Sequence, residues 1–184
     1  REKAALETGI PFSNICVAAT HTHMAKPHND LEPAIIQAIT DAQANLRPVR
    51  LKSAVGQEFD VSHNRRYFMK DGSVMFNPMF LNPDIVKPAG PIDPEVGLVM
   101  LYQDDSPTAC LINFALHLDI VKEYGAVYQK TGSGSRNSVS ADYPYWIERS
   151  LRDDFGNEFN SVFFTGCCGN LNHWDFSKPG PQSG

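Results

Sequence analysis

The sequence predicts an α/β fold in which a mixed β-sheet is layered with helices. Short β-branched and apolar runs alternate along the chain with segments of helical periodicity. Two runs, Val96–Tyr102 and Thr108–Ala115, are joined by the turn sequence DDSP, which predicts antiparallel neighbours. A third run, Ser161–Thr165, follows a helical segment instead of a tight turn. Hairpin and crossover connections together favour a mixed sheet.

The first elements are a helix, a strand and a second helix. Arg1–Thr8 is typical of the end of a helix, and the apolar run Asn14–Thr20 predicts a buried strand. Asp30 is a favourable N-cap for the second helix, which Pro48 terminates. Its apolar positions recur at helical spacing, at Ile35, Ile39, Ala42 and Leu46.

The middle of the chain combines one strand with a long excursion. Arg50–Phe59 alternates loosely and predicts a strand. Val61–Pro94 is rich in turn residues, and Asp71–Gly72 predicts a hairpin within it. Because aromatic residues are interleaved along this stretch, we expect an ordered and functional loop.

The last elements are a helix and a strand that opens into a polar loop. Asp142 is a suitable N-cap, with Pro144 in the first turn and Gly156 near the helix end. The strand Ser161–Thr165 then leads directly into the segment Gly166–Asn170.

Length, charge and composition exclude several classes of protein. The 184 residues, 42% of them apolar, fit one folded unit. A net charge of −5 provides no sequence-wide basic field for nucleic acid, and no apolar run is long enough to span a bilayer. Four scattered cysteines do not form a disulfide framework. Because the chain begins at Arg1 and ends in the Pro/Gly/Ser-rich stretch Phe176–Gly184, we expect it to be a fragment of a larger domain.

Three histidines are candidate metal ligands. His21 and His23 directly follow the predicted first strand, and two imidazoles at i and i+2 of an extended segment point to the same face. His117 follows another apolar strand, so both strands could deliver histidines to one sheet edge. Surface or core histidines are the alternative interpretation for all three. His28 is a possible further ligand, although its place before the second helix also fits a loop residue.

Two loops hold further candidates. Arg65 and Arg66 place guanidinium groups beside aromatic residues, which suits the binding of a carboxylate, a phosphate or an oxyanion; a solvated basic loop is the alternative. The loop Gly166–His173 (GCCGNLNH) has the composition of a tight turn whose N–H groups bind an anion or a carbonyl oxygen, and an ordinary turn is the alternative. Asp119 and Asp142 are candidates for proton or metal chemistry, and Asp142 is also explained as a helix cap.

Taken in order, six short motifs resemble the neutral/alkaline non-lysosomal ceramidase family, amino-terminal catalytic domain, over almost the whole of residues 1–184. The most distinctive motif is Ala19–His23 (ATHTH). The others are Asn64–Arg66 (NRR), Asn82–Asp84 (NPD), Asn113–His117 (NFALH), Ser140–Pro144 (SADYP) and Gly166–His173 (GCCGNLNH).

The resemblance implies a zinc-dependent amidase that cleaves the N-acyl bond of ceramide to sphingosine and fatty acid. His21 and His117 are then zinc ligands, His23 transfers a proton or orients substrate, and Arg65 is the active-site arginine. The substrate and oxyanion loop comprises Gly166, Cys167, Gly169, Asn170 and His173. The family's glutamate and tyrosine ligands lie downstream of these 184 residues, so we expect this piece to be inactive alone. A secreted or periplasmic location is also implied, whereas the oligomeric state is left open.

The loop departs from the family pattern at two positions. Ceramide-cleaving members have Ser-Asn-x-Gly-Asp-Val-Ser-Pro-Asn there, whereas this chain has Gly166 at the serine position and Asn170 at the aspartate position. Two other functions therefore stay open. One is a metal-dependent hydrolase of another amide or ester, and the other is a catalytically inactive lipid- or glycan-binding domain.

Overall fold

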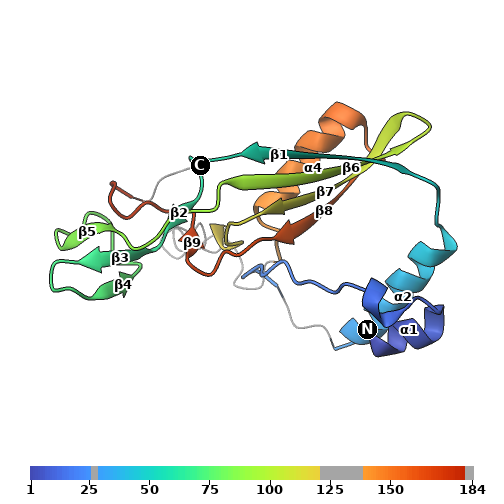
Figure 1. Cartoon of the computed structure of the whole chain (residues 1–184), viewed down its shortest axis with the longest axis horizontal. Helices are drawn as coiled ribbons and strands as arrows, with labels where there is room; N and C mark the ends of the chain where they lie inside the picture. The colour runs from blue at the N-terminus through green and yellow to red at the C-terminus, as the bar shows by residue number, and fades with distance from the viewer. Residues whose placement is uncertain (26–28, 121–138, 181–184) are drawn as a thin grey trace.

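The computed structural model describes residues 1–25, 29–120 and 139–180, and it has the predicted α/β architecture (Figure 1). Its largest element is a four-stranded sheet of order β1-β6-β7-β8. The strands are β1 (Arg50–Gln57), β6 (Glu95–Gln103), β7 (Ser106–Phe114) and β8 (Asn160–Thr165). The central strand β6 is antiparallel to both of its neighbours, β1 and β7, whereas β8 is parallel to β7. The sheet is therefore mixed, as predicted.

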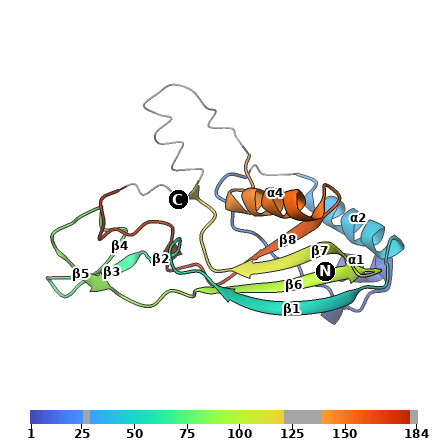
Figure 2. The same ribbon diagram turned by 90° about the horizontal axis from the view of Figure 1, so that it is seen from above.

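One face of this sheet carries the main core. The helix α4 (Tyr143–Phe155) lies over that face (Figure 2). Cys110, Ile112 and Phe159 are buried there, and residues from β6, β8 and α4 pack against them. The helix begins as predicted, because the Asp142 carboxylate accepts a hydrogen bond of 2.8 Å from the Tyr143 N–H.

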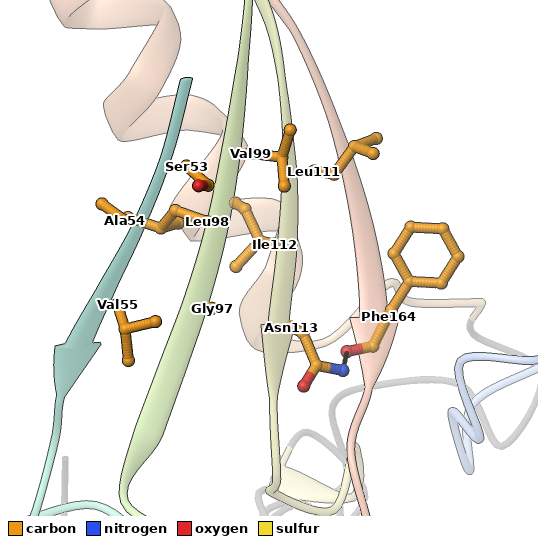
Figure 3. Close-up of a pocket in the computed structure, with 10 residues that line it drawn as sticks. All are labelled: Ser53, Ala54, Val55, Gly97, Leu98, Val99, Leu111, Ile112, Asn113 and Phe164. Atoms are coloured by element: carbon orange, nitrogen blue, oxygen red, sulfur yellow. Dashed lines mark hydrogen bonds between the residues drawn. The ribbon is translucent and has the colours of Figure 1, made fainter. Parts of the chain in front are cut away.

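The opposite face of the sheet is more open. Residues from all four strands line a shallow apolar depression there (Figure 3). Asn113 lies within it and donates to the Phe164 carbonyl oxygen at 2.9 Å. None of the residues that line this depression is a histidine.

Both predicted hairpins are present. The β6–β7 turn is made by Asp104 and Asp105, which have φ values of 45° and 67°. Positive φ at two consecutive residues is the geometry that matches the twist of paired strands. The second hairpin joins β3 (Arg66–Met69) to β4 (Val74–Phe76), and Gly72 has a φ of 83° in its turn.

The segment predicted as an irregular excursion is ordered and contains more regular structure than predicted. Its strands β4, β3 and β5 (Ile85–Pro88) form a small antiparallel sheet. Tyr67, Met69 and Phe176 form a second core on this sheet. A further strand, β2 (His63–Asn64), pairs with β9 (Leu171–Asn172) and links the segment to the end of the chain. This pair lies between the two larger sheets (Figures 1 and 2).

The amino-terminal region differs from the prediction in two places. Two helices are present, α1 (Glu2–Thr8) and α2 (Leu31–Ala44), and they pack together. The predicted strand Asn14–Thr20 is wrong, because a 3-10 turn, η1 (Phe12–Asn14), precedes a stretch without regular secondary structure. This stretch has apolar residues but no backbone ladder, and its link to β8 is a side-chain bond from Thr165 Oγ1 to the Thr20 carbonyl oxygen. Leu46 lies beyond the end of α2 and is exposed, so it does not extend the apolar face.

Within the described ranges, no helix is both long enough and apolar enough to cross a lipid bilayer.

Candidate metal centre

Three histidine rings meet at one point of the structure. The ring centroids of His21, His23 and His117 lie 4.9 to 5.3 Å apart. One potential ligand nitrogen from each ring lies within 4.8 Å of the other two. The structure therefore brings together the three histidines that the sequence singled out. His28 lies in residues 26–28, outside the described part of the chain.

His21 and His23 reach this point from an irregular segment and not from a strand. His21 has a φ of 62°, a left-handed conformation that few residues other than glycine adopt. The His23 N–H donates to the Leu118 carbonyl oxygen at 2.9 Å, and the Thr22 hydroxyl donates to the Ser140 carbonyl oxygen at 2.9 Å. The expected extended geometry is wrong, whereas the convergence with His117 is present.

His117 follows β7, as predicted, and it is buried. Its Nδ1 lies 2.8 Å from the Cys168 carbonyl oxygen. A carbonyl only accepts hydrogen bonds, so Nδ1 carries the proton and Nε2 keeps a lone pair for a metal or a donor. Burial, and then the positive charge of Arg65, lowers the pKa of His117, so the imidazole is neutral at neutral pH.

Arg65 is fixed beside this histidine. Its Nε and Nη2 atoms donate to the Gly169 carbonyl oxygen at 3.3 and 2.9 Å, and its backbone N–H donates to the Asn170 carbonyl oxygen at 2.9 Å. The guanidinium carbon lies 4.2 Å from the centre of the Phe76 ring. Nη2 is 3.4 Å from Nε2 of His117. Arg66, the neighbouring candidate, is exposed on β3 instead.

The loop Gly166–His173 contacts the centre through carbonyl oxygens. Three consecutive carbonyls, those of Cys168, Gly169 and Asn170, hold His117 and Arg65 in place. Cys167 is exposed, whereas burial raises the pKa of the Cys168 thiol, so this thiol stays protonated and unreactive. The loop positions the two side chains, and its role as a donor of N–H groups to an oxyanion stays a prediction.

His173, from the same loop, contacts Asp119 instead of joining the histidine cluster. Its Nδ1 lies 3.4 Å from Oδ1 of Asp119, and both side chains are about nine-tenths buried. Burial alone would raise the pKa of Asp119, but the contact with His173 and the fields of His117 and His23 outweigh it, so this pKa is lowered. The sequence offers only a weak signal for this pair, because Asp119 and His173 lie far apart in the chain and in no common motif.

The donor set of the cluster fits a borderline-soft transition metal ion. Imidazole nitrogens are common ligands of such ions, and nitrogens that share one zinc ion lie about 3.3 Å apart in a tetrahedral site. His21 and His23 are exposed, so their rings can rotate to close this distance. The cluster could therefore hold a metal ion. Comparison with family models, curated proteins and solved structures finds no match to this chain.

Proposed function

We propose that this chain is part of a zinc-dependent hydrolase that cleaves N-acyl amide bonds, as ceramidases do. The observation that carries the proposal is the convergence of His21, His23 and His117, with Arg65 held 3.4 Å from His117. The resemblance described for the sequence supports the substrate class, a lipid-like amide.

Each residue has a separate role in this proposal. His21 and His117 would hold zinc, because His117 is fixed by the Cys168 carbonyl and its Nε2 is available as a ligand. A bound zinc ion supplies a water of lowered pKa and polarises a carbonyl oxygen. His23, which is exposed, moves a proton to the leaving amine, and Arg65 donates to the oxygen on which negative charge develops. Water is consumed, its hydroxyl group joining the acyl carbon and its proton joining the amine.

A second candidate is hydrolysis of a different amide or ester, and Gly166 favours it. A Cβ atom placed on Gly166 would lie 3.1 to 3.2 Å from atoms of Ala115, which is closer than ordinary packing. The position at which ceramide-cleaving relatives carry a serine therefore leaves little space for a side chain. We therefore expect the substrate contacts of this chain to differ from those of the ceramide-cleaving proteins.

The test is hydrolysis of N-acylsphingosine and of a panel of simpler N-acyl amides and esters. It compares this chain with a longer protein that also contains the expected downstream ligands. We expect zinc-dependent turnover by the longer protein, abolished by a chelator and lowered about 10²- to 10⁴-fold by His23→Ala, whose zinc content stays near that of the wild type. Turnover of esters but not amides would support the second candidate, and an absence of turnover with zinc bound would contradict both.

A further inference from the structure

We propose that Asp119 supplies the negative charge that balances a divalent cation at the centre formed by His21, His23 and His117. It acts from outside the ligand set, paired with His173. This inference rests on the proposed function, because it requires a metal ion at the centre.

The need for such a charge follows from the charges of the site. Imidazole ligands bring no negative charge to a bound dication, and the guanidinium of Arg65 adds a positive charge beside His117. Concentrated positive charge in a partly buried site is unfavourable unless a negative group compensates it. The metal-binding group found in the described part of the chain contains no carboxylate.

Asp119 is placed to compensate this charge. It is 6% exposed and lies two residues after His117, and the intervening Leu118 carbonyl oxygen accepts the His23 N–H at 2.9 Å. Residues 117–119 therefore provide one proposed ligand, anchor the segment that carries His21 and His23, and hold a buried carboxylate. Because this carboxylate is shielded from water, its field is weakly screened.

A residue of the loop Gly166–His173 holds the carboxylate of Asp119 in place. His173 fixes the carboxylate, with Nδ1 3.4 Å from Oδ1 and the Trp174 ring packed at its edge, 5.0 Å between centroids. The alternative is that Asp119 only orders the loop through His173, in which case its shape matters and its charge does not.

The experiment measures the zinc dissociation constant of the 184-residue chain by competition with a chromophoric chelator. Asp119→Asn keeps the shape and removes the charge, and Asp119→Glu keeps the charge. Asp175→Asn is the matched control, since this carboxylate pairs with Lys178 at 3.2 Å and lies outside the metal-binding group. Melting temperatures without metal report whether each variant folds.

We expect Asp119→Asn to weaken zinc binding about 10- to 100-fold, the range typical of groups just outside the ligand set. Asp119→Glu should bind more tightly than Asp119→Asn, and Asp175→Asn should bind as the wild type does. Arg65→Gln removes a positive charge and should therefore lower the zinc dissociation constant. This variant keeps the test decisive if Asp119→Asn does not fold.

Zinc binding by the wild type together with unchanged binding by Asp119→Asn would overturn this inference and leave the proposed function standing. Equal losses in Asp119→Asn and Asp119→Glu, or weaker binding by Arg65→Gln, would also overturn it, because shape rather than charge would then decide affinity. An absence of zinc binding by both this chain and the longer protein would overturn the proposed function itself.

Discussion

At the scale of single residues, Gly166 is a closely packed position of the site loop. It packs directly on Ala115, two residues before His117, and its N–H donates to the Phe114 carbonyl oxygen at 2.9 Å. Gly169, three residues later, has no atom within 4 Å of the position where a Cβ would lie, and its φ is not positive. Substitution of Gly169 is therefore a suitable control for substitution of Gly166.

Gly166→Ala should lower the free energy of unfolding by about 1–3 kcal/mol, because the added methyl group forces the loop away from Ala115. Gly169→Ala should leave it unchanged or raise it slightly, since alanine restricts the unfolded chain without a clash. Urea unfolding of both variants measures the difference. Equal stability of the two variants would show that the close approach at Gly166 does not exist.

Tyr67 links the small sheet to the end of the chain and makes stability depend on pH. Its hydroxyl accepts the Phe176 N–H at 3.1 Å and lies 3.4 Å from Oδ1 of Asp175. Burial raises the pKa of Tyr67 to about 12. The folded phenol therefore keeps its proton at a pH where the unfolded phenol, with a pKa of about 10, loses it.

The stability that Tyr67 contributes is present below pH 10 and is lost as the pH rises from 10 to 12. Over this interval the wild type should lose on the order of 1–3 kcal/mol more than Tyr67→Phe, which has no phenol to ionise. Urea unfolding at pH 8, 10 and 11.5 checks the difference. Parallel pH curves for the two proteins would contradict the burial of this hydroxyl.

At the scale of elements, successive side chains of β7 point to opposite faces of the sheet, one packed under α4 and one more open. Ile112 is 4% exposed and packs in the core under α4, whereas Leu111 points to the more open face and is only partly buried. Ile112→Ala should cost about 2–4 kcal/mol of unfolding free energy, and Leu111→Ala clearly less, because only the first leaves a cavity in a closed core. Chemical denaturation of the pair gives the comparison, and a larger loss for Leu111→Ala would mean that the opposite face is the buried one.

The elements that the sequence predicted correctly carry strong local signals. Each of these signals depends on a few adjacent residues. They are the turns at Asp104–Asp105 and Asp71–Gly72 and the helix cap at Asp142. The strand predicted for Asn14–Thr20 failed because apolar, β-branched composition reports only that a segment is suited to a sheet. Whether a ladder partner lies beside it is a tertiary property that local sequence does not contain.

At the scale of the whole molecule, the centre lies where separate segments meet. His21 and His23 come from the amino-terminal segment, His117 from the end of β7, and Arg65 follows β2. The sequence identified these residues by type and motif, and the structure brings them together. The Asp119–His173 contact and the three loop carbonyls could not be predicted, because they depend on how β2, β9 and the residues after β7 pack together.

The central claim is that His21, His23 and His117 form one metal centre, and the zinc content of the chain tests it most directly. Zinc per chain is measured by mass spectrometry after saturation and removal of the excess. The measurement uses the longer protein that contains the expected downstream ligands, as the wild type and as the variants His21→Ala, His117→Ala and the control His63→Ala. His63 is the matched control because it lies on β2 outside the cluster. We predict about one zinc ion in the wild type and in His63→Ala, and its loss in the other two variants. A wild type without zinc, or zinc retained in His117→Ala as in the control, would contradict the account.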